Sequence, residues 1–416
     1  MNLNTKIVLV FTIVIAVSIG VLVAADHSDP NNPTPTFGFF QDDAKIVVDA
    51  NNQFALNFYS ELVSQNDSSN NIFFSPVSIS TAFAILYEGA DGNTSSEMQD
   101  VFGFEEDDSK RRKSFASMMQ SLNPQDEQYK LRLANALWLA KGFTPLPEYT
   151  GIVETYYDSK AESLDFSSGN TVDTINNWTS EKTEGKIEKL FDSLNSGTKM
   201  VITNAIYFKG TWVHQFDPER TKDRQFWLTE EESVMVPTMD LPRTYLNYFR
   251  ERDGMQVLEL PYKGDDVSML VLLPERIDGL NELEKSLTLE KISNLKSNME
   301  NIHIAVSLPK FTMETDYDLK KFLPVMGITD VFDSANSDLG GISGENGLFV
   351  DQAIHKAFVD VNEEGTEAAA ATGMAMLQSG FSFRVNHPFL FIIQDNSTGQ
   401  ILFMGRVMDP TIGLEK

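Results

Sequence analysis

Residues 363–372 constrain what this chain can fold into more than any other segment. They read EEGTEAAAAT, an acidic turn marked by Gly365 and followed by a run of small uncharged side chains. Alanine has the highest intrinsic helix propensity and Thr366 could cap a helix, so local preference favours a helix. The alternative is a segment that enters an existing β-sheet as a strand, where bulk or charge on the inward face would be prohibitive. The function of the chain depends on which alternative holds.

The composition limits the classes of function. A chain of 416 residues with 42% hydrophobic residues can bury a large core. Its 33 Lys and Arg against 60 Asp and Glu give a formal net charge of −27, which disfavours nucleic acid and anionic lipid surfaces as partners. There is no cysteine, which excludes disulfides, thiolate metal sites and cysteine nucleophiles.

The N-terminal residues predict a targeting segment. Lys6 precedes an uncharged run, residues 7–25, that ends in small side chains. This pattern predicts a signal peptide over residues 1–25, with an uncleaved membrane anchor as the alternative, because about 20 apolar residues span a bilayer. In either case we expect the protein to be secreted and extracellular, or tethered to the outer face of a membrane.

The rest of the chain predicts a tether followed by one α+β domain. Residues 26–43 are rich in Pro and Asn and predict a flexible tether, which leaves residues 44–416 as a single domain. Apolar residues at helical spacing predict helices over residues 49–64 and 78–89. Buried strands are predicted over residues 131–140, 200–208, 257–262, 267–273, 302–308, 381–385, 389–394 and 401–406, the last two forming a hairpin. Helices dominate the first part of the domain and antiparallel strands dominate the last part. This order indicates an α+β fold with a large sheet.

Catalytic motifs are missing from the sequence. It contains no phosphate-binding loop, and residues 341–344 (GISG) fall one residue short of a nucleophile elbow. The five histidines are scattered without metal-ligand spacing. We therefore expect no enzyme activity, no cofactor and no metal site.

Several segments resemble the serpins, the family of serine protease inhibitors, from about residue 44 to residue 410. The matching segments, in the order of the family, are residues 71–80 (NIFFSPVSIS), 203–212 (TNAIYFKGTW), 308–311 (LPKF), 317–319 (YDL), 327–332 (GITDVF), 386–391 (NHPFLF) and 403–407 (FMGRV). The resemblance implies a large, mostly antiparallel central sheet, two further sheets, about nine helices and an exposed reactive-centre loop at about residues 363–385.

The resemblance also implies a mechanism and a partner. A serpin is a suicide substrate: an extracellular serine protease cleaves the loop and forms an acyl-enzyme, the loop inserts into the central sheet, and the protease is trapped in a covalent complex. We expect a monomer that touches a membrane only if the N-terminal segment is an uncleaved anchor. The alternative is a serpin-fold protein that binds or chaperones without inhibiting.

Loop insertion imposes an alternation on the hinge, because strand side chains point to opposite faces with period two. The family register places one set inward: Thr366, Ala368, Ala370, Thr372, Met374 and Met376. The outward set is Glu367, Ala369, Ala371, Gly373 and Ala375. The expected hinge comprises Glu363, Gly365, Thr366, Glu367, Ala368, Ala369, Ala370, Ala371 and Thr372. Since every inward side chain is small or apolar, the sequence favours an insertion-competent, inhibitory loop.

Two polar clusters match elements that control the central sheet in the family. Ser75, Ser78, Asn204 and His355 match the shutter, a hydrogen-bonded cluster beneath the central strands. Trp212, Lys310 and Glu363 match the breach at the top of the sheet, with an ion pair expected between Lys310 and Glu363. A static polar core and an exposed ion pair of little energetic weight are the alternatives.

The reactive bond is the least determined feature. Counting from the hinge glycine gives Ser379–Gly380, and counting back from the C-terminal side gives Leu377 or Gln378 as the alternative residue before the cut. No Arg or Lys occurs there, so we expect a subtilisin-, elastase- or chymotrypsin-like target. Residues 110–113 (KRRK) fall where some relatives bind sulfated polysaccharide, but the acidic residues just before them favour a solvated charge run.

Overall fold

The computed structural model describes residues 41–65, 67, 69–122, 129–252, 254–366 and 380–414. Ten α-helices lie within this part of the chain. They are α1 (Gln41–Gln65), α2 (Pro76–Tyr87), α3 (Gly92–Phe102), α4 (Asp108–Leu122), α5 (Pro147–Tyr157), α6 (Thr171–Lys182), α7 (Leu280–Ser286), α8 (Leu289–Ser297), α9 (Leu319–Met326) and α10 (Gly340–Ser343). The two helices predicted from hydrophobic spacing correspond to α1 and α2.

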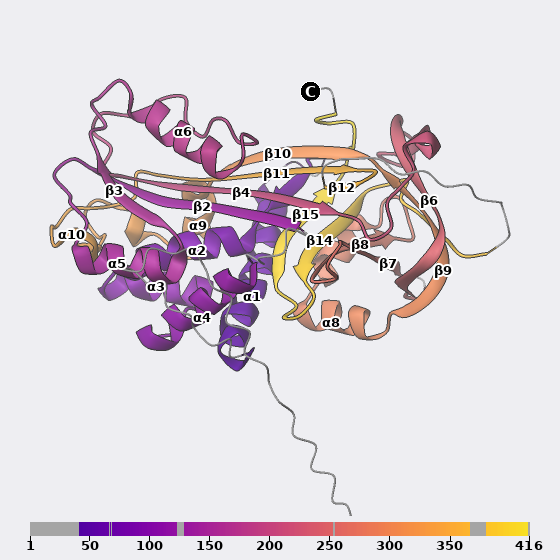
Figure 1. The fold of residues 1–416 in the computed structure, drawn as a ribbon, viewed down its shortest axis with the longest axis horizontal. Helices are drawn as coiled ribbons and strands as arrows, with labels where there is room; N and C mark the ends of the chain where they lie inside the picture. The colour runs from indigo at the N-terminus through magenta and orange to yellow at the C-terminus, as the bar shows by residue number, and fades with distance from the viewer. Residues whose placement is uncertain are drawn as a thin grey trace, which may run out of the picture. The chain divides into compact units, whose positions relative to one another are not determined.

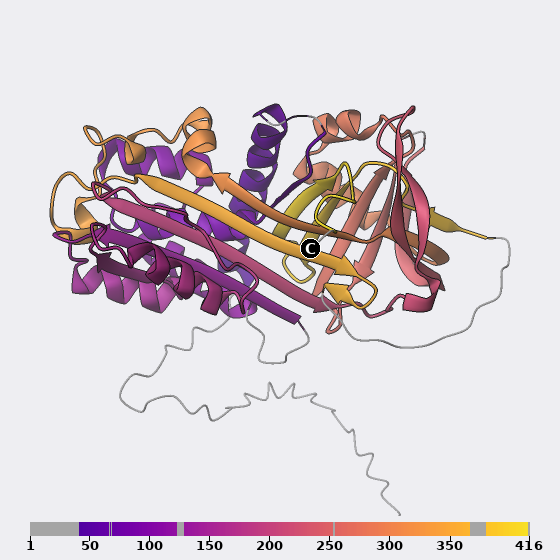
Figure 2. The ribbon, with the colours of Figure 1, turned by 90° about the horizontal axis from the view of Figure 1, so that it is seen from above.

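The central sheet has six strands in the order β10-β11-β12-β4-β2-β3 (Figures 1 and 2). Its strands are β2 (Tyr129–Ala140), β3 (Lys160–Leu164), β4 (Met200–Thr211), β10 (Phe311–Asp318), β11 (Gln352–Asn362) and the two-residue β12 (Gly365–Thr366). The β11–β4 and β2–β3 pairs are parallel, and the other neighbours are antiparallel. In Figure 1, α6 covers one face of this sheet, while α2 and α5 lie on the other.

A second sheet has nine strands in the order β1-β15-β14-β8-β7-β6-β9-β13, with β5 paired to β6. Its strands are β1 (Ile72–Phe74), β5 (Lys222–Trp227), β6 (Ser233–Arg250), β7 (Met255–Pro261), β8 (Val267–Pro274), β9 (Glu300–Pro309), β13 (Ser382–Arg384), β14 (Phe389–Asp395) and β15 (Ile401–Val407). The predicted strands and the β14–β15 hairpin are confirmed.

The number of sheets differs from the expectation of a central sheet with two others. The long strand β6 pairs with β9 over most of its length, while its last residues, Tyr248 to Arg250, also pair with β7. This continuous hydrogen bonding joins what were expected as two separate sheets into one. The helix count is ten rather than about nine in the described residues, because the four-residue α10 is included.

The core is built around α2, whose sequence PVSISTAFAILY is apolar on all sides. Every residue from Pro76 to Leu86 is buried, as is typical of a helix enclosed by other elements. Ser75 begins this helix by accepting a hydrogen bond from the Ser78 amide, and Pro76 occupies the first turn, where no amide donor is needed. The first turn of α2 also contacts the central sheet, because Asn204 on β4 donates to Ser78.

The helical start of the described chain shortens the predicted tether. α1 begins at Gln41, so the last three residues of the expected segment 26–43 are helical. The prolines that exclude a helix end at Pro35, which leaves nothing in residues 41–43 to prevent one. Residues 1–40, with the predicted targeting segment, lie outside the described residues.

Candidate functional site

The junction between β4 and β11, called here the β4/β11 seam, is closed at one end and open at the other. At the closed end, called the bottom here, the two strands pair directly from Gln352↔Val201 to Phe358↔Tyr207. At the open end, called the top, they diverge and β12 lies between them. There, Thr366 is opposite Val361 of β11 on one side and Gly210 of β4 on the other. The described start of the predicted hinge is thus a turn and a short strand that occupies the open end of the seam.

Gly365 is required at this position by both space and backbone conformation. Its φ of +151° is one that residues with a side chain rarely adopt. A Cβ atom here would overlap with the carbonyl oxygen of Gly210. Glycine therefore lets β12 approach β4 closely enough to pair.

Two of the three predicted breach residues, Lys310 and Glu363, form the expected ion pair beside the turn that leads into β12. Lys310 Nζ donates to Glu363 Oε2 at 2.8 Å, and Thr221 Oγ1 donates to Glu363 Oε1 at 2.6 Å. Glu363 is only 8% exposed. Burial alone would raise the pKa of Glu363, but the hydrogen bonds from Lys310 and Thr221 hold that pKa below its usual value. The carboxylate is charged and held on both of its oxygens.

Trp212 binds the main chain of the turn that leads into β12. Its Nε1 donates to the Asn362 carbonyl at 3.1 Å, and its amide donates to the Glu364 carbonyl at 2.8 Å. The indole is buried and stacks on Tyr262, with ring centroids 4.3 Å apart. The turn is therefore held through its backbone as well as through the side chain of Glu363.

The four shutter residues form one buried network across the closed part of the seam. The Ser75 amide donates to His355 Nε2 at 3.1 Å, and Ser75 Oγ donates to the Leu402 carbonyl at 2.7 Å. His355 Nδ1 bonds Asn204 Oδ1, and Asn204 Nδ2 donates to Ser78 Oγ at 2.7 Å. His355 and Asn204 are also direct partners across the parallel β11–β4 pair. Opening the seam at this level would break the bond between their side chains.

The network fixes the protonation state of His355. Because Nε2 accepts from an amide, the single proton of a neutral ring must lie on Nδ1, where it is donated to Asn204. Burial lowers the pKa of His355 from 6.5 to about 3. A second proton would face the Ser75 amide, so the network is consistent only with the neutral ring.

Two further members of this cluster were missed by the sequence analysis. Asn135 on β2 accepts a hydrogen bond from Asn204 through Oδ1, and its own buried Nδ2 has no hydrogen-bond partner among the residues that the structure describes. Tyr317 stacks nearly parallel to His355, with ring centroids 6.4 Å apart. A lone Asn in the apolar strand sequence LRLANALWLA was the available signal for Asn135.

The predicted reactive bond lies at the edge of the described residues. Residues 367–379, with Leu377, Gln378, Ser379 and the rest of the hinge, are outside them. Gly380 is exposed, and the chain then enters β13, which pairs in parallel with β9 from Ser382↔Ala305 onward. The two described ends of the predicted loop are therefore β12 in the central sheet and β13 in the second sheet.

A model of the family described as "Serpin (serine protease inhibitor)" matches residues 49–410. The chain belongs to the serpin family. Human leukocyte elastase inhibitor is 40% identical over 375 residues, which cover 87% of this chain and 98% of that protein. A serpin-like protein of Methanosarcina acetivorans is 39% identical over 373 residues, which cover 88% of this chain and 86% of that protein.

Solved serpin structures have the same fold as this chain. Serpin48 of the insect Tenebrio molitor matches with a TM-score of 0.80 and 34% identity, covering 89% of this chain and 98% of Serpin48. Uncleaved ovalbumin matches with a TM-score of 0.80 and 32% identity, covering 88% and 100%. The serpin fold expected from the sequence is confirmed.

The predicted location is wrong. The relatives named leukocyte elastase inhibitor and serpin B6 are intracellular serpins, which contradicts a secreted or membrane-tethered protein. In the described part of the chain, no helix combines the length and apolarity needed to cross a bilayer.

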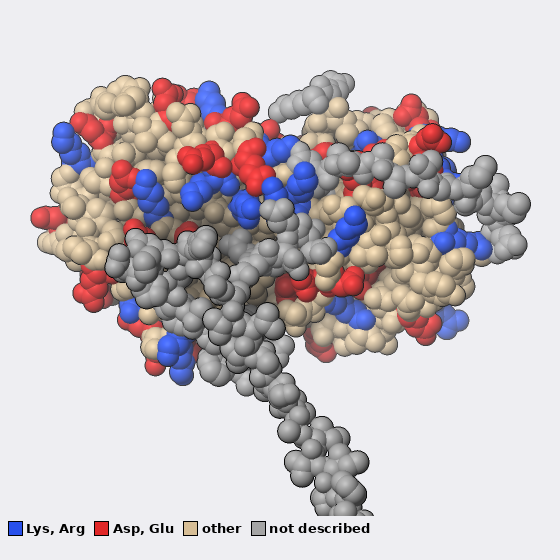
Figure 3. Space-filling view, in the orientation of Figure 1, with Lys and Arg blue, Asp and Glu red and all other residues tan. Residues whose placement is uncertain are grey.

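The basic run at residues 110–113 is not a solvated charge run throughout. Arg111 is 2% exposed and Arg112 is partly buried, and both pair with the buried carboxylate of Glu88 at 3.0 and 2.7 Å. Tyr157 also donates to Glu88, at 2.6 Å. These arginines join α4 to α2 and α5. Figure 3 shows acidic and basic side chains mixed over the face in view, without a large area of one sign.

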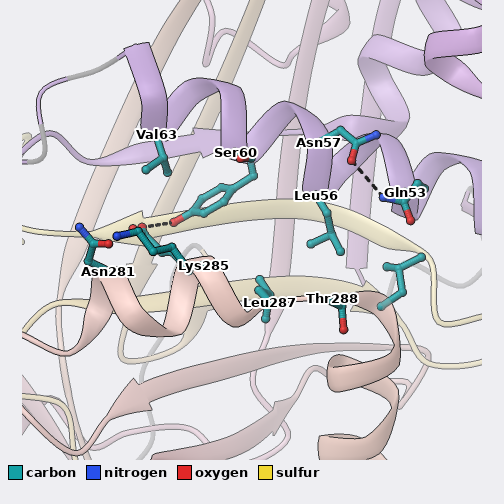
Figure 4. A pocket seen from close by; sticks show the side chains of 12 residues that line it. Gln53, Leu56, Asn57, Ser60, Val63, Asn281, Lys285, Leu287 and Thr288 are labelled. Atoms are coloured by element: carbon teal, nitrogen blue, oxygen red, sulfur yellow. Dashed lines mark hydrogen bonds between the residues drawn. The ribbon is translucent and has the colours of Figure 1, made fainter.

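A pocket of about 420 Å³ lies between α1 and the α7–α8 segment, away from the seam (Figure 4). Leu56, Val63 and Leu287 supply apolar lining, and Tyr59 donates to Glu284 at its edge. None of the hinge, shutter, breach or reactive-bond residues that the structure describes lines it.

Proposed function

We propose that this serpin inhibits serine proteases as a suicide substrate. The protease serine attacks the carbonyl carbon of Ser379, the amine of Gly380 leaves, and the loop stays attached to the enzyme as an ester. The loop then extends β12 down the β4/β11 seam. The resulting displacement distorts the protease before water hydrolyses the ester.

The observation that carries this proposal is the register of β12. β12 runs antiparallel to both β4 and β11. If the loop continued in this register, each next loop residue would pair with the preceding residue of β4 on one side and of β11 on the other. Ala368 would then lie between Phe208 and Val359, and Ala370 between Ile206 and Ala357. All four of these neighbours are buried. Small loop side chains would therefore meet apolar partners, as insertion requires.

The same register brings the polar loop residue to the polar part of the seam. Thr372 would lie between Asn204 and His355, the two side chains that insertion separates. Its hydroxyl can both donate and accept a hydrogen bond, so it could replace the bond that is lost. Met374 would follow between Ile202 and Ala353, which are again buried and apolar.

An elastase-type protease is the target class that we favour. Relatives in human, pig, mouse and two frogs carry the name leukocyte elastase inhibitor. The residues before the proposed cut are Met376, Leu377, Gln378 and Ser379, which suit the apolar or small specificity pockets of elastase-, chymotrypsin- and subtilisin-like enzymes.

The test is to incubate the purified protein with pancreatic elastase, chymotrypsin and subtilisin and to run the products in SDS. We expect a complex that survives SDS with at least one active protease and none with the same protease blocked at its active serine. N-terminal sequencing of the released fragment should begin at Gly380. Cleavage of the loop without such a complex would instead identify a non-inhibitory serpin.

A further inference from the structure

Another pocket, of about 550 Å³, lies among segments that are far apart in the sequence. Its wall is formed by the end of α1, the β5–β6 turn, the start of α7, the end of β15 and the residues that follow β15. Cavities of about 300–1,000 Å³ are typical of sites that bind small molecules. The described hinge, shutter, breach and reactive-bond residues all lie outside its wall. The pocket is therefore separate from the machinery of the central sheet.

One part of the pocket wall is apolar. Its side chains are Val63, Leu228, Ile277, Leu280, Met408 and Ile412. Ile412 is 54% exposed, so it forms an apolar lip at the surface rather than part of the core. An apolar ligand that displaced water from this wall would gain free energy through the hydrophobic effect.

The polar part of the wall carries mostly negative charge. It has the carboxylates of Glu230, Glu232, Asp278, Glu284 and Asp409, and the guanidinium of Arg406. Arg406 is buried and donates to Glu284 at 3.1 Å. The same guanidinium donates to the main-chain carbonyls of Asn70 and Asp67 at 3.0 and 3.1 Å. Among the described residues, the wall therefore offers no cation that is still available to bind an anion.

Two of the carboxylates lie at the rim of the pocket. Glu230 and Glu232 are exposed and belong to the turn between β5 and β6. Neither forms an ion pair with another described residue. The Leu228 amide donates to the Glu232 carbonyl at 2.8 Å, and the Glu232 amide donates to Thr229 Oγ1 at 3.0 Å. The turn is thus closed, and it holds two available negative charges beside the apolar wall.

Hydrogen bonds and an ion pair also hold the remaining walls in place. Asn71 Oδ1 accepts from the amides of Met408 and Asp409 at 2.7 and 3.0 Å. Arg276 pairs with Asp278 at 2.5 Å. A ligand would bind without first ordering these segments, which reduces the free-energy cost of binding.

We propose that this pocket binds a small organic cation with an apolar body, such as an alkyl or aryl amine. The ammonium group would lie at the carboxylates of Glu230 and Glu232, and the apolar body would lie against the wall that ends at Ile412. An anionic ligand would meet charge of its own sign, and a neutral one would lack the attraction to the rim. The site does not depend on loop insertion, so it goes beyond the proposed function.

The experiment measures the binding of octylammonium, octanoate and 1-octanol to the intact protein by isothermal titration calorimetry. The three probes share one alkyl chain and differ in charge. We expect octylammonium to bind about tenfold more tightly than octanoate, because attraction to two exposed carboxylates replaces repulsion from them. The affinity for 1-octanol should lie between the two.

Two double variants separate the rim from the general charge of the protein. Glu230→Gln with Glu232→Gln should weaken octylammonium binding about fivefold and leave 1-octanol binding unchanged. The matched control is Glu231→Gln with Asp223→Asn, which removes the same charge from exposed positions on the same hairpin that do not line the pocket. The control should bind octylammonium as the wild type does.

A second pair of variants tests the apolar wall. Ile412→Ser should weaken octylammonium and 1-octanol binding by a similar factor, about threefold, because both lose apolar contact with the lip. Val325→Ser is the control, since Val325 is 65% exposed on α9 and does not line the pocket. It should bind both probes as the wild type does.

The outcomes that would overturn the proposal are distinct from those that bear on inhibition. Equal weakening by the two double variants would show only the general attraction of a cation to a chain with a net charge of −27. That result, octanoate binding as tightly as octylammonium, or no detectable binding of octylammonium would each overturn the site. The proposed inhibitory function is judged by the SDS-stable complex and stands or falls independently of these titrations.

Discussion

Acid should destabilise this serpin through His355 in particular. The buried ring is neutral, with Nε2 accepting from the Ser75 amide and Nδ1 donating to Asn204. Its folded-state pKa is about 3, compared with an ordinary value of 6.5. Between these two values the unfolded chain carries a proton on this ring that the folded protein does not.

The sign and size of the effect follow from linkage. Because the unfolded state binds more protons in this window, the contribution of His355 is present in full above pH 6.5 and is lost as the pH falls towards 3. Each unit of pH changes the free energy of unfolding by about 1.4 kcal/mol. At pH 5, one and a half units below 6.5, the loss is about 2 kcal/mol.

The measurement is urea unfolding at pH 7.5 and pH 5.0 for the wild type, His355→Gln and His303→Gln. His303 is exposed and serves as a control for the loss of an imidazole. The wild type and His303→Gln should lose about 2 kcal/mol more than His355→Gln between the two pH values. Equal losses in all three proteins, or an NMR titration of the His355 ring near pH 6.5 in the folded state, would refute the reasoning.

Three further predictions concern the hinge and the buried charges. Gly365→Ala should displace β12 from the sheet and raise the ratio of cleaved inhibitor to SDS-stable complex, measured by gel densitometry; an unchanged ratio would contradict the need for glycine. Ala370→Arg should abolish the complex while Glu367→Arg retains it, because position 370 would lie between the buried Ile206 and Ala357 and position 367 between the partly exposed Lys209 and Asp360; equal behaviour would exclude the register of β12. Glu88→Gln should lower the free energy of unfolding by about 2 kcal/mol, because the buried guanidinium of Arg111 would lose its buried carboxylate partner and keep the ion pair to the largely exposed Asp108 at 2.6 Å. A loss below about 1 kcal/mol in urea unfolding would contradict that reading.

The sequence predicted those parts of the fold that depend on local pattern. Continuous apolar runs predicted β2 and β4, because strands covered on both faces need apolar side chains on both. The joining of two sheets through β6 was not predictable in the same way. It depends on which strands the end of β6 meets, and hydrophobic period carries no information about that pairing.

Charged residues were predicted least well. Residues 110–113 looked solvated because four basic residues follow four acidic ones, yet Arg111 is buried by α2 and α5. Its partner Glu88 lies 23 residues earlier in the sequence and was not predicted to pair with these basic residues. The polar cluster at the seam was accessible only through resemblance to serpins, and Asn135 was missed because it lies in an otherwise apolar strand.

The geometry of the seam requires that insertion, if it occurs, proceed from the top downward. β12 already pairs with both neighbours there, whereas β4 and β11 still bond to each other below. Each added loop residue would break the hydrogen bonds between β4 and β11 at its level and form hydrogen bonds to both strands. The number of backbone hydrogen bonds would therefore rise, which favours insertion once it has started. The first polar obstacle on this path is the bond between His355 and Asn204, and the register brings Thr372 to it. On the proposed mechanism, the hydroxyl of Thr372, which follows the four alanines, would replace the hydrogen bond that insertion breaks.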